Sequence, residues 1–389
     1  MDAVILMQMI DNWKDTISAS PLSPFDDNVL EFFDDLSRRL VKIRAYSDVA
    51  TFGFWCRKAS LMKEKKAYDD LQSRLGRGVV FHSTPSNVPV NFAFSFAAGL
   101  LAGNSNIIRL PSKDFEQVEI IVDSVNELLS DKYKGLASYI SFVKYSSSKE
   151  LHDQFSSICD VRVIWGGDDT INRLRQSPLK PRATDLTFAD RYSIAVINTN
   201  EYVKASNKSE IAQAFYNDTY FSDQNACTAP RIIYWIGSEK EAAKTAFWES
   251  LRSLVIEKYE LTPIQAVGKL AAFYLAAANA SIELKNSSDC FVTLIDVKNP
   301  DEELMNFKHN SGFFFEHDID ELKDILPTCG ERLQTLVYYG LKKDDISAFI
   351  TEFKPKGIDR AVPIGKSMDF SLTWDGYDLI RHLSRKIVM

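Results

Sequence analysis

The sequence predicts a two-lobed α/β protein whose strands are mostly parallel. The chain has 389 residues, which is more than a single hydrophobic core usually supports. From residue 78 onward, short apolar runs of strand type alternate with helical stretches, and a second series of this kind begins near residue 207. Strands separated by helices of crossover length form βαβ units, and these place the strands parallel to one another.

The first lobe is predicted to begin with a helix and to continue with alternating strands and helices. Apolar residues recur at helical spacing within 23–45, after a Ser-Pro start, and predict an amphipathic helix there. The predicted strands are 78–83, 106–111, 139–145, 161–165 and 193–197, and the predicted helices between them are 89–103, 113–130 and 149–158.

The second lobe repeats the pattern with longer helices. A helix at 207–220 leads through the loop FSDQNAC (221–227) to a strand at 231–237. We expect long helices within 238–280, then strands at 290–296, 311–316 and 334–340, with a helix from Ile319. The segment 354–366 carries Pro and Gly and is predicted to be a connection, and the aromatic run after it is dense enough to pack on something.

Composition narrows the class of protein. The net charge of −7 argues against general nucleic-acid binding, which needs a concentrated basic field. The five cysteines are odd in number and widely spaced, without a C-x-x-C pair, which is typical of a reducing compartment and not of a disulfide framework. The apolar amino-terminal stretch lacks a basic region and a cleavage site, so we expect a cytoplasmic protein without a membrane span.

Several familiar motifs are missing. A phosphate-binding loop ending in Gly365-Lys366-Ser367 would need a glycine five residues earlier, where Arg360 stands. The chain has no G-x-G-x-x-G and no G-x-S-x-G, and its five histidines do not have metal-site spacing. Ordinary dinucleotide, serine-hydrolase and metal signatures therefore do not identify a site.

Cys227 is the strongest candidate for chemistry. It lies between the polar residues of a predicted loop and a strand starting near Arg231, where a thiol can be exposed and turned toward a cleft. The alternative is that Cys227 is a small buried hydrophobe, the more frequent role of any single cysteine.

Five segments carry a resemblance to known families. The run HSTPSNVPVNFAFSFAAGLLAGNSNIIRLPS (82–112) and the loop 221–227 resemble the T-P-x-N-x-P segment and the nucleophile loop of aldehyde dehydrogenases. WGGDDTINRLR (165–175) resembles the loop and helix that cover the nicotinamide cofactor's phosphates in that superfamily. PRATDLTFADRYSIAVI (181–197) and the run 357–385 resemble the fatty-acyl (acyl-CoA) reductase subunit family of bacterial bioluminescence.

The resemblance implies a fold and a division of the chain. The fold would be aldehyde-dehydrogenase-like, with a Rossmann-type parallel-sheet cofactor domain and an α/β catalytic domain. We accordingly expect an N-terminal helical region (1–75), a nicotinamide cofactor-binding domain (76–200), a catalytic domain carrying the nucleophilic cysteine (201–350) and a C-terminal connection and packing or oligomerisation segment (351–389).

It also implies a set of site residues. Cys227 would be the nucleophile, and Asn87 would stabilise the oxyanion together with the Cys227 amide. The alternative for Asn87 is a turn asparagine. Asp168 and Asp169 are interpreted as helix N-caps. The cofactor-binding residues implied are Ser86, Arg109, Ser112, Lys113, Gly166 and Gly167.

Two departures from the superfamily pattern bear on function. Thr187 stands nearest the position of the glutamate that activates water in hydrolytic aldehyde dehydrogenases, which favours exchange with a thiol over hydrolysis. The K-P-S-E pattern becomes Leu110-Pro111-Ser112-Lys113, so Arg109 and Lys113 could face a 2′-phosphate, and NADPH is expected, with NADH possible. The alternative for these two cations is a solvated position beside a strand.

The hypothesis is therefore NADPH-dependent reduction of an acyl thioester to an aldehyde. The donor would be acyl-CoA, acyl carrier protein or an acyl-enzyme. Alternatives are a CoA-acylating aldehyde dehydrogenase, an acyl-phosphate reductase and a non-catalytic acyl-transfer scaffold. The resemblance implies a homo-oligomer and an acyl-activating synthetase or transferase partner, with no nucleic acid bound.

Overall fold

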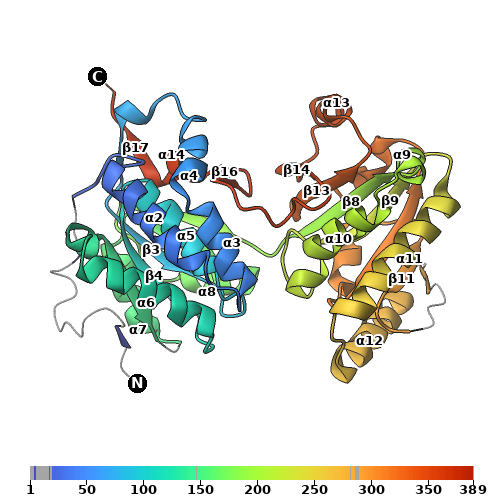
Figure 1. The fold of residues 1–389 in the computed structure, drawn as a ribbon, viewed down its shortest axis with the longest axis horizontal. Coiled ribbons are helices and arrows are strands. Elements are labelled where there is room, and N and C mark those ends of the chain that lie inside the picture. The colour runs from blue at the N-terminus through green and yellow to red at the C-terminus, as the bar shows by residue number, and fades with distance from the viewer. Residues whose placement is uncertain are drawn as a thin grey trace. The chain divides into compact units, whose positions relative to one another are not determined.

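The computed structural model describes residues 4–5, 17, 20–145, 147–280, 282–284 and 289–388. The chain forms two compact units, one of Met1–Ala189 with Phe370–Met389 and one of Asp190–Asp369 (Figure 1). The four-part division expected from the sequence stays a prediction. We expected that the apolar amino-terminal stretch is not a signal peptide, and most of that stretch lies outside the described residues.

The first unit is organised around a six-stranded sheet in the order β1-β5-β4-β3-β6-β7. Five strands are parallel, and the short β1 (Val4–Ile5) pairs antiparallel with β5. The parallel strands are β3 (Val79–Ser83), β4 (Ser105–Arg109), β5 (Ile140–Lys144), β6 (Val161–Trp165) and β7 (Thr184–Phe188). The predicted strands 78–83, 106–111, 139–145 and 161–165 are thus confirmed.

Helices connect these strands and complete the core. The connecting helices are α5 (Asn91–Leu101), α6 (Glu116–Ser130), α7 (Lys149–Ile158) and α8 (Asp168–Arg175), with the 3₁₀ helix η2 (Lys134–Tyr139) before β5. The amino-terminal helices α2 (Asp27–Leu40), α3 (Ser47–Trp55) and α4 (Lys58–Lys65) pack on the same core. In α2 the apolar stripe predicted from the sequence is buried, and Asp26 caps the helix through the Asn28 amide.

The C-terminal segment packs onto the first unit. Its elements are β15 (Thr373–Trp374), β16 (Tyr377–Asp378), α14 (Leu379–Leu383) and β17 (Ser384–Lys386), and β17 pairs with β2 (Arg74–Gly76), which follows η1 (Leu71–Ser73). Phe370 contacts the rings of Trp55 and Phe94, with centroids 5.4 and 4.7 Å away. The aromatic run therefore has an intramolecular partner.

The second unit has a seven-stranded sheet in the order β10-β11-β12-β9-β8-β13-β14. All neighbouring strands are parallel except β10 and β11. The strands are β8 (Tyr192–Asn198), β9 (Pro230–Ile236), β10 (Ile282–Leu284), β11 (Thr293–Val297), β12 (Phe313–Ile319), β13 (Leu333–Tyr339) and β14 (Arg360–Pro363). The helices are α9 (Thr199–Lys204), α10 (Lys208–Asp218), α11 (Lys240–Lys258), α12 (Pro263–Asn279) and α13 (Lys343–Phe353), with 3₁₀ helices η3 (Tyr220–Ser222), η4 (Glu302–Phe307) and η5 (Leu322–Thr328).

Two expectations for this unit were wrong, and one helix was missed. The segment 354–366, predicted to be a connection, contains the edge strand β14. The helix expected from Ile319 is instead the 3₁₀ helix η5, because Ile319 ends β12 and Pro327 interrupts the helical hydrogen bonds. Helix α13 was not predicted at all.

Helix α12 carries an unusual surface. Ile264, Val267 and Tyr274 are 80%, 67% and 63% exposed, whereas its single charged residue, Lys269, is buried. An exposed helix face that is apolar and uncharged is typical of an interaction surface. Among the described residues, no helix is long and apolar enough to cross a membrane.

Asn104 provides a test of how the C-terminal segment is held. Its fully buried side chain accepts from Arg77 N (2.7 Å) and Gly78 N (3.2 Å) and donates to Gly99 O (3.1 Å) and Leu383 O (2.9 Å). Asn104→Ala should lower the free energy of unfolding by about 2–4 kcal/mol, because buried polar groups lose their partners. Urea denaturation measures this, with the exposed Asn207→Ala as the control; equal losses in the two variants would contradict the assignment.

Candidate active site

The loops that carry the predicted cofactor residues leave the first sheet at one edge. In the strand register, Ser83 of β3 lies beside Arg109 of β4 and Ile164 of β6. Strands β4 and β5 lie on one side of β3, and β6 and β7 on the other. Parallel sheets bind ligands at their carboxyl edge where the strand order reverses in this way. That point lies between the loop after β3 and the loop after β6.

The two loops at this point are open. Ser86 and Asn87 are exposed in the turn between β3 and α5. The Gly166 amide donates to Phe188 O (3.1 Å), and a Cβ added at Gly167 would meet no atom within 4 Å. The amides of a helix's first turn lack intrahelical acceptors, so the start of α8 can receive a phosphate.

The interpretation of Asp168 and Asp169 as N-caps was wrong. Gly167 occupies the N-cap position of α8, and the two aspartates follow in its first turn. Their negative charges interact favourably with the positive end of the helix dipole, but they would repel a phosphate placed against them. Both are exposed and can turn toward solvent.

Arg109 ends the second strand of the βαβ unit, where a bound dinucleotide places its adenosine ribose. Its guanidinium lies over the Tyr145 ring, 4.7 Å from the centroid. Its carbonyl accepts a hydrogen bond from Thr84 Oγ1 (2.6 Å), and its buried Nε has no hydrogen-bond partner among the described residues. Ser112 and Lys113 are exposed in the loop that follows.

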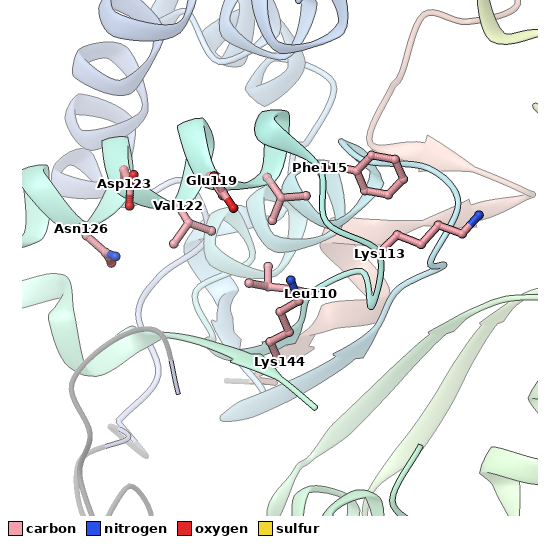
Figure 2. Close-up of a pocket in the computed structure, with 9 residues that line it drawn as sticks. Leu110, Lys113, Phe115, Glu119, Val122, Asp123, Asn126 and Lys144 are labelled. Carbon is pink, nitrogen blue, oxygen red and sulfur yellow. The ribbon is translucent and has the colours of Figure 1, made fainter. Parts of the chain in front are cut away.

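A cavity of about 290 Å³ lies next to this loop. Lys113, Lys144 of β5 and the α6 residues Glu119, Asp123 and Asn126 contribute to its lining. In Figure 2, the Lys113 side chain points away from the α6 residues. Lys113 is the predicted cofactor residue that borders the cavity.

A buried polar layer underlies the same edge and was not found from the sequence. His82 bonds Ser95 Oγ through Nδ1 (2.8 Å) and Asn106 Oδ1 through Nε2 (3.0 Å). Trp165 Nε1 donates to the same Ser95 oxygen (3.0 Å), and its ring stacks on Phe188 with centroids 3.7 Å apart. Burial lowers the pKa of His82 to about 4, so the imidazole is neutral at physiological pH. The sequence did contain a signal for this layer, because polar residues stand within otherwise apolar strands.

Thr187 lies on β7, next to Phe188 in the chain. The side chain is half-buried, and its hydroxyl accepts from Arg175 at 3.4 Å. A hydroxyl of this kind does not serve as a general base near neutral pH.

Cys227 lies in the second unit, in the loop between η3 and β9. Asp223 and Gln224, which open the loop, both have left-handed backbone conformations with φ of 51° and 54°. Ser193 Oγ on β8 donates to the Cys227 carbonyl (2.8 Å), and the Cys227 side chain is half-buried. The loop therefore holds the thiol at the amino edge of the second sheet.

Gln224 fixes the loop from inside the protein. Its Oε1 accepts from Gly312 N (2.9 Å) and Phe313 N (3.1 Å), and its Nε2 donates to Pro230 O (3.2 Å) and Phe313 O (3.3 Å). The side chain is fully buried. A buried amide with its hydrogen bonds made defines one position for the backbone around it.

Asp223 ties the loop to two further segments. Its carboxylate accepts hydrogen bonds from Ser311 Oγ (2.7 Å), Gln265 Nε2 (3.3 Å) and the Tyr259 hydroxyl. Gln265 lies in the first turn of α12. These contacts offset the cost of about 1–3 kcal/mol that a left-handed residue other than glycine carries.

Two buried cations accompany the loop. Arg231 on β9 donates to Gln224 O and His309 O, and Lys269 donates to Ser311 O (2.7 Å) and Cys290 O. Burial lowers the pKa of Arg231 to about 10 and that of Lys269 to about 8. Positive charge of this kind favours a thiolate nucleophile.

The predicted residues are divided between the units. Ser86, Asn87, Arg109, Ser112, Lys113, Gly166 and Gly167 belong to the first unit, whereas Cys227 belongs to the second. The pairing of Asn87 with Cys227 stays a prediction. Within the described residues, no cluster of His, Cys, Asp and Glu has the geometry of a metal site.

A family model described as acyl-CoA reductase (LuxC) matches residues 12–287. The chain belongs to this family. Among similar proteins, the long-chain acyl-protein thioester reductase of Vibrio harveyi is 22% identical over 324 residues, covering 80% of this chain and 63% of the relative. Reductase 2 of Photobacterium leiognathi is 30% identical over 165 residues, covering 42% of this chain and 33% of the relative. The match to the Aliivibrio fischeri reductase likewise spans about a third, 32%, of that protein.

Solved structures show the fold of this LuxC-family chain. Aldehyde dehydrogenase 21 of Physcomitrella patens has a TM-score of 0.67 at 14% identity, covering 97% of this chain and 90% of the other. Staphylococcus aureus AldH has a TM-score of 0.60 at 14% identity with the same coverage. The two-lobed aldehyde-dehydrogenase-like fold and the family expected from the sequence are therefore confirmed.

A buried carboxylate holds the segment after β14 in this LuxC-family chain. Asp218, the last residue of α10, accepts from Gly365 N (2.6 Å) and Ser367 N (3.0 Å). Thr228 Oγ1, next to Cys227, donates to Met368 Sδ (3.3 Å). Asp218 therefore stabilises a segment that contacts the loop carrying Cys227. Burial raises the pKa of Asp218 from 3.8 to about 6.

This pKa gives the stability a defined pH dependence. Because the folded-state pKa of Asp218 exceeds its unfolded value, the folded protein binds the proton more tightly, and stability falls as pH rises from about 4 to about 6. Asp218→Asn does not titrate. The unfolding free energy of the wild type minus that of the variant should decrease by about 3 kcal/mol between pH 4 and pH 7. Denaturant titrations at each pH measure the difference, and a constant difference would contradict the account.

Proposed function

We propose that this LuxC-family chain reduces a long-chain acyl thioester to the aldehyde, using NADPH and a thioester formed on Cys227. The observation that carries the proposal is the nucleophile loop. A half-buried thiol stands on a backbone fixed by Gln224 and Ser193, with a buried arginine close by in the chain. The names of the bacterial relatives, long-chain acyl-protein thioester reductases, support this substrate class.

The acyl transfer uses side chains and one backbone amide of this chain. The Cys227 thiolate attacks the carbonyl carbon of acyl-CoA, an acyl carrier protein or an acyl-enzyme, and the donor thiolate leaves with its bond electrons. The Asn87 amide and the Cys227 backbone N–H donate hydrogen bonds to the oxyanion. Losing one such donor typically slows a reaction by about 10²–10³-fold.

The first unit supplies the groups suited to a nicotinamide dinucleotide. Arg109 and Lys113 would face the 2′-phosphate of NADPH, with Ser86 and Ser112 as neighbouring hydroxyl donors. Gly166 and Gly167 would let the pyrophosphate approach the start of α8. The partnerless Nε of Arg109 and the open space at Gly167 fit this use. When bound, the cofactor supplies a hydride to the acyl carbon; NADH is the alternative donor.

Thr187 favours reduction over hydrolysis. Without a carboxylate base at this position, water near the acyl-enzyme is not activated. The acyl group on Cys227 is then either reduced by hydride or transferred back to a thiol. CoA-acylating oxidation of an aldehyde and reduction of an acyl phosphate would use the same residues, whereas a non-catalytic scaffold would not need a fixed thiol.

We also propose that the chain self-associates through the exposed face of α12. The face has no exposed charge, so two copies meet without electrostatic repulsion. A cytoplasmic location accords with CoA-linked chemistry and with the absence of disulfides among the five cysteines, all of which are described. An acyl-activating synthetase or transferase is the expected source of the acyl group.

The acyl-enzyme can be trapped directly. Palmitoyl-CoA without a reductant should add one acyl group to the protein, on the Cys227 peptide, in a form that hydroxylamine cleaves. Intact-protein and peptide mass spectrometry measure the product. The Cys290→Ser control, at the exposed cysteine, should acylate normally. A Cys227→Ser protein that still carried the acyl group as a thioester would contradict the proposal.

Cofactor preference tests the role of Arg109. Arg109→Gln should raise the KM for NADPH by about tenfold or more, because a charge-assisted contact to the 2′-phosphate is lost. The KM for NADH, which lacks that phosphate, should change by less than about twofold. The exposed Lys58→Gln on α4 serves as the control in steady-state assays. An equal loss with both cofactors would show that Arg109 does not select the phosphate.

A further inference from the structure

We propose that Arg231 is the positioning residue of this site, the buried cation that keeps Cys227 as a thiolate while it fixes the nucleophile loop. The inference rests on the proposed role of Cys227 as the acyl acceptor. It adds a residue to that site, and the contacts that support it all lie within the second unit.

The geometry places Arg231 across the loop. It is the second residue of β9, four residues after Cys227, and only 5% exposed. One guanidinium nitrogen donates to Gln224 O, in the same loop, and another donates to His309 O. Arg231 therefore holds Cys227's loop against the segment that leads into β12, alongside the Gln224 side-chain contacts.

The guanidinium of Arg231 has no carboxylate among its hydrogen-bond partners in the described residues. Its contacts among the described residues are two neutral carbonyl oxygens. Arg162 and Lys244 differ: Arg162 bonds both oxygens of Asp185 at 2.7 and 3.0 Å, and Lys244 lies 2.6 Å from Asp318. Lys269 shares the pattern of Arg231, because it donates to Ser311 O and Cys290 O. Because a buried charge is costly unless an anion compensates it, the interior around Arg231 favours a nearby negative charge.

Other charged groups near the site have their own partners. Asp223 is held by Tyr259, Ser311 and Gln265, and Asp190 pairs with Lys308 and Arg332. The negative charges of both carboxylates destabilise a thiolate at Cys227, whereas the positive charge of a second cation stabilises it. That cation is Arg360 on β14, whose guanidinium donates to Ser367 O at 2.9 Å and to Lys366 O at 2.8 Å.

Electrostatics supports the same conclusion. Burial lowers the pKa of Arg231 and of Arg360. Nearby negative charges raise both pKa values again: Asp190 and Asp223 act on Arg231, Asp369 and Asp218 act on Arg360, and an ionised Cys227 acts on both. Interactions between charges are reciprocal, so the two arginines stabilise the thiolate by as much as it stabilises them. Arg231 differs from Arg360 in also bonding the loop that carries the thiol.

The test follows thiolate reactivity against pH. In a Cys290→Ser background, the iodoacetamide alkylation rate of the Cys227 peptide is measured by mass spectrometry for wild type, Arg231→Gln and Arg231→Lys. Arg231→Gln should move the midpoint of the rate profile upward by about one pH unit and slow alkylation about tenfold at neutral pH. Arg231→Lys should keep the midpoint near wild type, because the charge remains. Lys244→Gln, which removes a buried cation at the opposite end of the sheet, should leave it unchanged.

A folded Arg231→Gln protein with the wild-type midpoint would overturn the inference, as would equal shifts in the Gln and Lys variants. If Arg231→Gln does not fold, the inference is tested by comparing the Tm of the wild type with that of Cys227→Ala at a series of pH values. The Tm advantage of the wild type should grow as pH rises from about 6 to 9, because a thiolate paired with a cation stabilises the folded state above its titration; a constant difference would overturn the inference. A normal titration without acyl trapping from palmitoyl-CoA would instead reject the proposed function alone.

Discussion

The buried Gln224 side chain makes the contacts on which the geometry of the loop carrying Cys227, the proposed nucleophile, depends. Its oxygen accepts from two successive backbone amides at the start of β12, and its nitrogen donates to carbonyls of Pro230 and Phe313. The backbone of Gln224 is left-handed, so the loop turns sharply before Cys227. Removing any of these partners would leave a polar group buried without a hydrogen bond, which costs about 1–3 kcal/mol. The thiol is therefore presented by a loop with one favoured conformation.

Both units use buried polar groups beneath an exposed edge. In the first, His82 and Trp165 share Ser95 below the loops at the carboxyl edge of the sheet. In the second, Arg231 and the buried side chain of Gln224 support the loop at the amino edge. Polar groups inside a core are stable only in the arrangement that satisfies them all, so they fix orientation where hydrophobic packing alone would tolerate small shifts. The proposed acyl transfer and hydride transfer would require this precision of their supporting residues.

The sequence predicted the features that local pattern determines. Strands β3 to β6 are buried on both faces and read as continuous apolar runs, which is why they were found. Strand β14 was missed because Arg360 and Pro363 at a sheet edge read as a connection. The resemblance to a known family predicted a role for Cys227, but not for Gln224 or Arg231, whose partners Phe313 and His309 lie 89 and 78 residues away in the chain. Contacts of that kind arise from tertiary structure and leave no local periodicity.

The central claim is that Cys227 passes an acyl group to hydride and not to water. The most direct measurement is the fate of an isolated palmitoyl-enzyme, freed of CoA and then mixed with NADPH or with buffer alone in a single turnover. The account predicts a long-lived acyl-enzyme in buffer and stoichiometric hexadecanal on addition of NADPH, because Thr187 does not activate water. Rapid release of palmitic acid in buffer, at a rate that NADPH does not alter, would contradict it.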